Sequence, residues 1–404
     1  MNQPLKEYHM TLETIGPVYI GNGRKIEKKG YIFTDKKHVR IMDVEKLYMY
    51  LKKKGIAAEY ENYLLGNDNN RGKRLEEWLK LKRISIAELS GCTKYSMECG
   101  EAIDYTKKGG GNQVAICEHI KDAYNMPYIP GSSIKGMLRT ILLADDIIKN
   151  NREYQHIKNG IDYEIEKAAR QGKVYKKSFL SDPITTAETD YFNKLNRNSK
   201  KKTDAVNDIM SKIIVNDSSP VDINNLILCK KLEGHTSGKE HQINVVRECI
   251  KPGTKISFTL TIVSDNSGND ISIQKIMRAV ESFARNYNEV FVSQFKDADL
   301  LNDDYVLLGG GSGFVSKTVI YPMFGQMEGS RKTNFILNNT TLKTREKKER
   351  DSEAGASPHI IMQDIMVRYY RWDYAGWLVK IHINISFCFK YLLIHLYNYS
   401  MKII

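Results

Sequence analysis

The sequence predicts a folded protein of the α+β class, because alternating strands and amphipathic helices follow one another in both halves of the chain. Residues 255–263 place apolar side chains at every second position, which is the period of a half-buried strand. Residues 273–295 follow with apolar side chains at helical spacing. With 404 residues, the chain is long enough for two domains that each have a core.

The first half opens with strands. Residues 5–15 alternate in part, and they lead to Gly21-Asn22-Gly23, where we expect the chain to make a tight turn because glycine permits positive φ. Residues 31–33 and 39–41 flank a polar turn and predict a hairpin. A helix is predicted from Asp43, as the N-cap, to about residue 54.

The strongest local signal is the segment from Gly131 to Arg139. An extended piece with two prolines passes into Gly131-Ser132-Ser133, and a helix is predicted to follow to about residue 148. We expect Ser132 or Ser133 to cap this helix, whose first exposed amides favour a phosphate. Lys135 and Arg139 are four residues apart and share one face, so they can bracket one stretch of backbone. The alternative is an ordinary capped helix with two solvated cations.

A second glycine-rich segment, Gly309-Gly310-Gly311-Ser312-Gly313, follows a predicted strand. No later glycine completes a dinucleotide-binding fingerprint, because Phe314 and Ser316 occupy the required positions. The segment therefore predicts a loop whose amides can approach a phosphodiester backbone, with Lys317 beside it. The alternative is a turn that binds no ligand.

Composition points to a polyanionic partner. The chain has 61 Lys+Arg against 48 Asp+Glu, a formal net charge of +13, and excess positive charge attracts phosphate at long range. Six cysteines without C-x-x-C pairs predict reduced thiols and a cytoplasmic protein. The start of the chain has no apolar signal region, and the most apolar stretch, residues 377–399, contains Lys380 and Lys390. We therefore expect no membrane partner.

No motif predicts catalysis or a cofactor. Candidate general bases are His9, His38 and His119, and candidate acids or metal ligands are Glu27, Asp35 and Asp104, but none has a recognisable catalytic spacing. A second set, Cys229, His235, His241 and Cys249, has intervals that match no standard zinc site. We expect no catalytic residue, no metal site and no cofactor.

Three segments together resemble the RAMP superfamily of CRISPR systems: residues 16–23 (GPVYIGNG), residues 128–139 (YIPGSSIKGMLR) and residues 309–314 (GGGSGF). Their order and separation span residues 5 to about 359. The resemblance implies two ferredoxin-like (RRM-like) domains, at residues 1–200 and 201–359, with a mainly helical insertion at about residues 43–125 in the first.

Within this superfamily the chain is most similar to the subunit that caps the guide RNA (crRNA) 3′ end in type III-A Csm effectors. The resemblance implies binding of crRNA, a part in maturation of the crRNA intermediate in antiviral defence, and contact with other Csm subunits, especially the repeating backbone subunit. A host nuclease is a further implied partner for trimming. Backbone subunits carry a target-cleaving aspartate soon after the first turn; here only Glu27 stands among cations, so target cleavage is not implied.

The resemblance and the local patterns assign RNA contacts to two groups of residues. These are Gly21, Gly23, Gly131, Ser132, Ser133, Lys135, Gly136 and Arg139, and then Gly309, Gly310, Gly311, Ser312, Gly313 and Lys317. The alternative function is a metal-independent RAMP endoribonuclease that cleaves precursor crRNA. Such an enzyme uses a histidine general base near a glycine-rich loop, and His9 or His38 would supply it.

Residues 360–404 differ in composition from the rest of the chain, because they contain no Glu, Pro or Thr. Ile381, Ile383 and Ile385 alternate as in a strand, and one interpretation is a closing strand with a helix. The other is an atypical tail that a frameshift produced after about His359.

Overall fold

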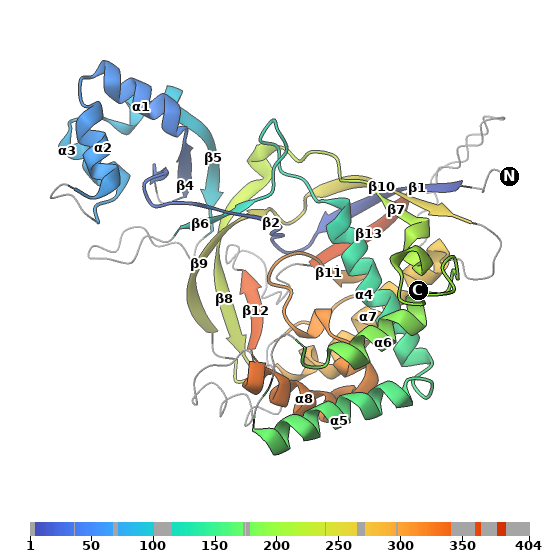
Figure 1. Ribbon diagram of the computed structural model, residues 1–404. Coiled ribbons are helices and arrows are strands. Elements are labelled where there is room, and N and C mark those ends of the chain that lie inside the picture. The colour runs from blue at the N-terminus through green and yellow to red at the C-terminus, as the bar shows by residue number, and fades with distance from the viewer. Residues whose placement is uncertain are drawn as a thin grey trace, which may run out of the picture.

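The computed structural model contains two β-sheets that share one large core (Figure 1). It describes residues 5–364 except 36, 68–71, 101–114, 173, 175–177, 239, 265–270, 296–297 and 341–359, together with residues 378–384. In the described part of the chain, no helix is both long and apolar enough to cross a membrane.

The first sheet has five antiparallel strands in the order β11-β13-β1-β10-β7. Its centre is β1 (Leu5–Thr14), which pairs along its length with β10 (Lys255–Val263). On the other side of β1 lies β13 (Leu378–Asn384), followed by β11 (Tyr305–Leu307), while β7 (Ile213–Val215) forms the opposite edge. The sheet thus takes strands from both sides of the boundary expected near residue 200.

Two helices, α4 (Gly131–Lys149) and α7 (Ile273–Val290), lie against one face of this sheet (Figure 1). Taken in chain order, β1, α4, β7, β10, α7 and β13 follow the β-α-β-β-α-β pattern of a ferredoxin-like unit. Alternate residues of β1 and β10, such as Leu12 and Leu260, are buried with apolar residues of both helices. This packing explains why the period-2 and period-3.6 patterns are strong in these segments.

The second sheet has the order β2-β6-β9-β8-β5-β4-β3, with β12 (Ile360–Asp364) paired to β8 as an eighth strand. Its longest strands, β8 (Leu226–His235) and β9 (Glu240–Ile250), form an antiparallel hairpin. Parallel pairing joins β5 (Thr93–Cys99) to β8 and β6 (Ile116–His119) to β9. The remaining strands are β2 (Gly21–Ile26), β3 (Tyr31–Phe33) and β4 (His38–Met42).

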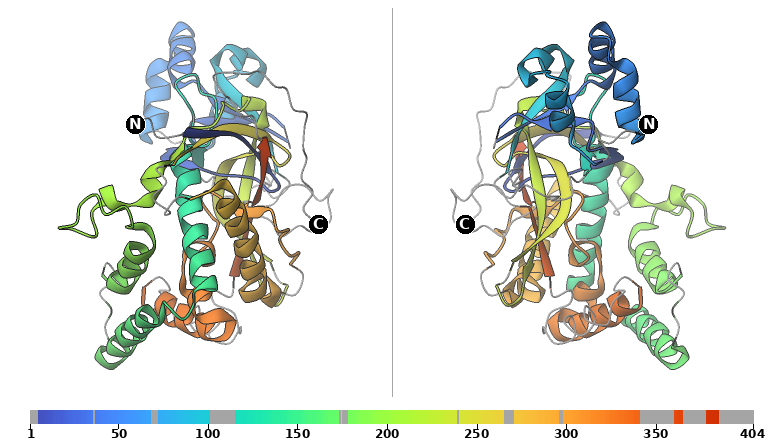
Figure 2. Two further views of the ribbon diagram at one scale, coloured as in Figure 1. Left: turned by 90° about the vertical axis from the view of Figure 1, so that its right-hand side faces the viewer. Right: turned by 90° about the vertical axis from the view of Figure 1, so that its left-hand side faces the viewer.

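A small helical lobe projects from the end of this sheet (Figure 2). It contains α1 (Val44–Lys53), α2 (Ala57–Leu65) and α3 (Leu75–Leu81). The lobe has its own core, in which the ring of Trp78 stacks on that of Tyr63 with 5.1 Å between centroids. Residues 43–125 therefore contribute this lobe and also two strands, β5 and β6, of the large sheet.

The opposite end of the molecule is helical. It is formed by α5 (Gln155–Gln171), α6 (Ser181–Phe192) and α8 (Ile320–Thr340). In α8 the helical geometry breaks at Gly325, whose φ is 70° and ψ is −168°. Both α5 and α8 lie far from the lobe that contains α1–α3 (Figure 1).

Several predicted elements are confirmed. The structure contains the hairpin of β3 and β4, and α1 begins after Asp43, whose carboxylate accepts a hydrogen bond from the Lys46 amide. One expectation is wrong: Gly21-Asn22-Gly23 does not form a tight turn after β1. It opens β2, in which the register with β6 shifts between Gly21 and Lys25. An irregular strand absorbs the extra residues that we interpreted as a turn.

The C-terminal segment supplies a strand in each sheet. The backbone of β13 pairs with β1 from His9↔Asn384 to Thr14↔Val379, as the closing-strand interpretation predicts. Residues 385–404, including Ile385 and the expected helix, lie outside the described residues. Whether a frameshift produced the tail stays a hypothesis.

Candidate nucleic-acid interface

The first and third of the predicted motifs lie in direct contact. The amide of Gly310 donates to the carbonyl oxygen of Tyr19 over 2.8 Å. At Gly309, which has φ +95°, a Cβ atom would lie 2.4 Å from the same carbonyl oxygen. Only glycine fits both the positive φ and this close approach. The fold therefore brings together segments that are about 290 residues apart in the sequence.

The loop at residues 309–313 has an alternating backbone. Gly309, Gly311 and Gly313 have positive φ, whereas Gly310 and Ser312 do not. Turns with positive φ at alternate residues can direct neighbouring amides to one side of a loop, where they bind anions. Within the described part of the chain, the amides of Gly311 and Gly313 donate to no protein acceptor. The loop can therefore offer amides to an external phosphate.

The side chains of the loop hold its shape. The hydroxyl of buried Ser312 donates to the Gly309 carbonyl oxygen over 3.1 Å, and the Ser316 hydroxyl donates to the Ser312 carbonyl oxygen over 2.7 Å. The exposed ammonium of Lys317 lies 3.5 Å from the Gly309 carbonyl oxygen. A positive charge therefore stands beside the loop, as the sequence predicts.

The ring of Tyr19 packs between the two glycine segments. A Cβ at Gly21 would lie 2.2 Å from the Tyr19 hydroxyl oxygen, and one at Gly310 would lie 3.2 Å from the ring. The Arg247 guanidinium lies 5.0 Å from the ring centroid and donates to the Gly310 carbonyl oxygen over 3.4 Å. Burial raises the pKa of Tyr19 to about 12, so its hydroxyl remains protonated at neutral pH.

Sequence reasoning did not assign a role to Tyr19 or Arg247. Tyr19 lies inside the first motif, but our interpretation of that motif rested on its glycines. Arg247 lies within β9, and nothing in the surrounding residues distinguishes it from other strand cations. Its position becomes informative only once β9 is seen beneath the glycine loop.

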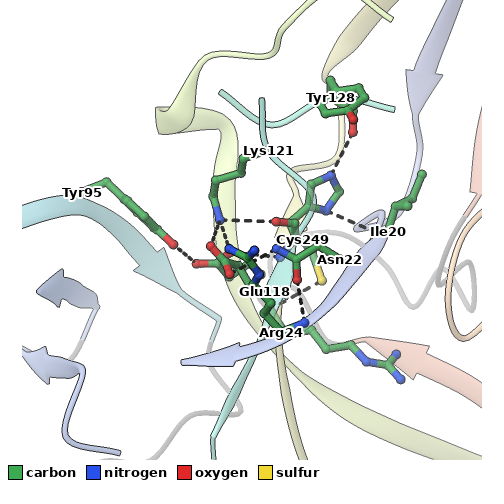
Figure 3. Close-up of polar contacts among 11 residues, drawn as sticks. Ile20, Asn22, Arg24, Tyr95, Glu118, Lys121, Tyr128 and Cys249 are labelled. Atoms are coloured by element: carbon green, nitrogen blue, oxygen red, sulfur yellow. Dashed lines mark hydrogen bonds and ion pairs between the residues drawn. The ribbon is translucent and has the colours of Figure 1, made fainter. Parts of the chain in front are cut away.

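His119, at the end of β6, joins the second motif to the first. Its Nδ1 accepts from the Ile20 amide over 3.3 Å, and its Nε2 lies 3.3 Å from the Tyr128 carbonyl oxygen (Figure 3). The ring is fully buried, and burial lowers the pKa of His119 to about 3. Since both ring nitrogens have partners and no exposure, His119 does not fit the role of general base.

The start of α4 differs from the prediction. The N-cap is Pro130, and neither Ser132 nor Ser133 caps the helix, because both lie inside its first turn. The first amide, of Gly131, instead donates to the Asp217 carboxylate over 2.8 Å. A Cβ at Gly131 would lie 2.2 Å from the Val215 carbonyl oxygen, so this glycine is needed for the helix to approach β7.

Lys135 and Arg139 both lie against residues 208–213. The Lys135 ammonium donates to the Ile213 carbonyl oxygen over 2.8 Å, and its burial lowers the pKa of the ammonium. Arg139 forms ion pairs with Asp208 at 2.5 Å and with Glu188 at 3.2 Å, and its guanidinium lies 3.9 Å from the ring centroid of Phe192. Ser132 and Gly136 are exposed on the same helix.

A buried polar network supports the interface from below. The Glu248 carboxylate, which is completely buried on β9, accepts hydrogen bonds from the Tyr95 hydroxyl, the Lys121 ammonium and, over 3.0 Å, the His119 amide. Lys121 also lies 4.8 Å from the ring centroid of Tyr95 (Figure 3). Strands β5, β6 and β9 are thereby fixed relative to one another.

The other catalytic candidates are scattered. His9 is exposed on β1, 3.7 Å from Glu7, and His38 is exposed on β4, 3.0 Å from Asp35. Glu27 lies in the turn after β2. Asp104 lies outside the described residues.

The four residues considered for zinc do not meet. Cys229 and Cys249 are buried near each other on β8 and β9, but His235 lies six residues farther along β8. Six strand residues span roughly 20 Å, so one ion cannot reach both Cys229 and His235. The His241 backbone is opposite Glu233, still farther from Cys249. The described residues contain no cluster of three or more side chains suited to a metal.

Comparison with known proteins agrees with this architecture. The model of the RAMP superfamily matches residues 11–359. A curated relative from Streptococcus thermophilus, named CRISPR system Cms protein Csm5, is 30% identical over 340 residues, covering 81% of this chain and 83% of the relative. A protein of the same name from Mycobacterium tuberculosis (strain CDC 1551 / Oshkosh) is 27% identical over 341 residues, covering 79% of this chain and 85% of the relative. Another, from Enterococcus italicus, is 25% identical over 349 residues, covering 78% of this chain and 80% of the relative.

Two solved structures have a similar fold. One is a chain of a Csm–crRNA–target RNA ternary complex from a type III-A CRISPR-Cas system, with a TM-score of 0.57, 18% identity, and coverage of 93% of this chain and 100% of that one. The other is Csm5 of T. onnurineus, with a TM-score of 0.54, 18% identity, and coverage of 82% and 95%. The chain therefore belongs to the RAMP superfamily, in the branch that contains the curated Csm5 proteins.

Proposed function

We propose that this chain is an RNA-binding subunit of a type III-A Csm effector and that the loop at residues 309–313 contacts the crRNA backbone. The observation that carries the proposal is the contact between this loop and the Tyr19–Gly23 segment, with Arg247 beside them. Alternating φ values, available amides and adjacent cations suit a phosphodiester. The curated relatives are named as Csm5, and one similar chain comes from a complex that contains crRNA.

The resemblance to the family supports a finer role. We propose that the chain caps the 3′ end of the crRNA, next to the repeating backbone subunit, and is needed for maturation of the crRNA intermediate. Its other partners would be further Csm subunits and a host nuclease that trims the RNA. The net charge of +13 supports an RNA partner over a scaffold that acts through proteins alone.

The proposed contacts include both predicted groups of residues. For Gly21, residues 309–313 and Lys317, the support is the geometry around Tyr19, whereas for Gly23 it is the resemblance to the family. For Gly131, Ser132, Ser133, Lys135, Gly136 and Arg139, it is the resemblance to the family. A phosphate at the start of α4 would compete with Asp217, and contacts by Lys135 or Arg139 would exchange their present partners.

We also propose two ferredoxin-like modules. The five-stranded sheet with α4 and α7 has the element order of one such module. The second module would be built on the eight-stranded sheet, from which the helical lobe projects. Because each sheet takes strands from both sides of residue 200, modules built on the sheets would be interleaved in the sequence and would not divide at about residue 200.

The central test is RNA binding by Arg247→Met across a series of salt concentrations. We expect the variant to bind guide RNA at least about tenfold more weakly than the wild type, with a shallower salt dependence, because each lost phosphate contact to a single strand removes about 0.7 from the slope. Arg170→Met is the matched control, since exposed Arg170 on α5 forms an ion pair with Glu166, one turn away on the same helix. Equal affinity and slope for wild type and Arg247→Met would reject the assigned site.

Lys135→Glu tests the second group of contacts in the same assay. If Lys135 contacts the guide backbone, charge reversal weakens binding to guides of any sequence to a similar extent. Unchanged affinity and slope would remove Lys135 from the interface. Copurification of the tagged chain with crRNA and other Csm subunits tests the wider role, and a chain that purifies with neither would overturn it.

We propose further that the chain has no catalysis of its own. Exposed His9 and His38 each face a carboxylate on their own hairpin or strand, and His119 has both nitrogens occupied. The purified chain should leave repeat-containing RNA intact in EDTA. Cleavage that His38→Ala or His9→Ala abolishes would instead establish the endoribonuclease alternative.

A further inference from the structure

Three segments that are distant in sequence meet at the proposed RNA interface, and each junction between them can be identified. The Tyr19–Gly23 segment contacts the glycine loop through the Tyr19 carbonyl oxygen. It contacts the Tyr128–Gly131 segment through the ring of His119. Ile20 and His119 are 99 residues apart, so local sequence does not fix their relation.

The two hydrogen bonds of the ring determine its protonation. Ile20 offers an N–H, so Nδ1 must provide a lone pair. Tyr128 offers a carbonyl oxygen, so Nε2 must carry the proton. Only the neutral Nε2–H form of His119 satisfies both neighbours. An extra proton on Nδ1 would face the Ile20 N–H and break that bond.

The position of the ring is itself determined by the network beneath it. The His119 amide donates to Glu248, which also binds Lys121, and all three lie at the junction of β6 and β9. The rings of His119 and Tyr19 also form an edge-to-face contact, with 6.3 Å between centroids and 70° between planes. Contacts of both its backbone amide and its ring therefore fix the position of His119.

We propose that His119 is the positioning residue of the RNA interface, setting the distance between the Tyr19–Gly23 segment and the start of α4 so that both can engage one RNA backbone at once. This inference rests on the proposed function. It goes beyond it in assigning a role to a buried residue that touches no RNA. It predicts that loss of the ring reduces the number of phosphates engaged together, even in a folded protein.

The test compares His119→Phe with the wild type in guide RNA binding across salt concentrations, with folding checked by thermal unfolding. We expect at least about a tenfold loss of affinity and a shallower salt slope at a temperature where the variant is folded. Tyr154→Phe is the matched control, because it removes one hydrogen bond of a buried aromatic side chain, that to Asp146, and leaves the Glu248 network and both ring contacts of His119 in place. Its affinity and slope should equal those of the wild type.

The outcomes distinguish a failure of the proposed RNA-binding function from a failure of the positioning role of His119. A wild-type chain that does not bind guide RNA overturns the proposed function, and the inference with it. A wild type that binds, together with a folded His119→Phe of equal affinity and slope, overturns only the positioning role. If His119→Phe does not fold, His119→Asn and His119→Gln replace it, since each can keep one of the two hydrogen bonds. Wild-type affinity in either folded amide variant would then overturn the inference.

Discussion

Glu248 binds groups from three neighbouring segments: the Tyr95 hydroxyl on β5, the His119 amide on β6, and the Lys121 ammonium just after β6. Both the carboxylate and the ammonium are almost completely shielded from water, with 0% and 5% of their side chains exposed. We expect Glu248→Gln to lower the free energy of unfolding by up to about 3–5 kcal/mol, because the buried Lys121 ammonium would lose its closer counter-charge and keep that of Glu118, 3.5 Å away. Urea denaturation measures this change.

The double variant Glu248→Gln/Lys121→Met is the control for that prediction. Removing both charges should recover part of the lost stability, since the buried ammonium is removed together with its closer counter-charge, while the less buried Glu118 keeps its hydrogen bond from Asn22. A double variant that is less stable than Glu248→Gln alone would show that Lys121 contributes through other contacts.

His119 predicts a pH dependence of stability. Its pKa is about 3 in the folded chain, against an ordinary value of 6.5, because burial disfavours the charged ring. Below pH 6.5 the unfolded chain binds a proton that the folded chain does not, so this contribution to stability falls as the pH decreases from 6.5 toward 3. Thermal unfolding of wild type and His119→Gln from pH 7 to 5 checks it. The difference in Tm between the two should shrink as the pH falls.

At the scale of single elements, a substitution at Gly136 on α4 distinguishes an effect on protein stability from an effect on RNA affinity. It is exposed inside a helix, and a Cβ there would meet nothing within 4 Å. Gly136→Ala should therefore stabilise the protein by about 0.5–1 kcal/mol, since alanine loses less backbone entropy in a helix. If Gly136 permits close approach of RNA, affinity falls although stability rises. Equal affinity would remove Gly136 from the interface.

Asp217, at the start of α4, leads to a second prediction, in which a substitution raises the affinity for RNA. Asp217 places a carboxylate on the first amide of the helix, where a phosphate would otherwise bind. Asp217→Asn keeps an acceptor but removes the negative charge, and we expect guide RNA affinity to rise severalfold at low salt. Ser218 and the helix should remain in place, with a stability change below about 1 kcal/mol. Asp182→Asn on α6 is the matched control, and a similar rise there would refute a local effect.

Periodicity predicted several elements closely and failed at others for identifiable reasons. Residues 255–263 form a strand with the expected bounds, because one face of the strand is buried and the other is not. Gly21-Asn22-Gly23 was misinterpreted because glycine allows a turn but does not require one. The serines of the second motif suggested a helix cap, but the carboxylate of Asp217 accepts the hydrogen bond from the first amide of the helix.

The candidate site could be predicted only in part. The glycine loop and Lys317 were found because their residue types are informative by themselves. Tyr19, Arg247 and the structural role of His119 were missed, since each depends on partners about 60 to 290 residues away. A single sequence carries no signal for such pairings.

For the whole molecule, the C-terminal strand is the feature with the largest predicted effect. The backbone of β13 lies between β1 and β11 in the first sheet. A chain ending at residue 364 would leave an edge of β1 unpaired and separate β11 from the sheet. We expect a lower Tm and concentration-dependent aggregation, measured by thermal unfolding and light scattering. A truncated chain as stable and monodisperse as the full one would show that β13 contributes little.

The pairing of β1 with β10 also bears on how the protein is made. The end of β1 leaves the ribosome 241 residues before the start of β10, from residue 14 to residue 255. At roughly 5–20 residues per second, β1 waits for on the order of ten to fifty seconds before its partner is synthesised. During that interval Met10 and Leu12, which end up fully shielded, remain accessible to chaperones and to other nascent chains. Translation speed and chaperone supply should therefore limit the yield of this subunit in the cell.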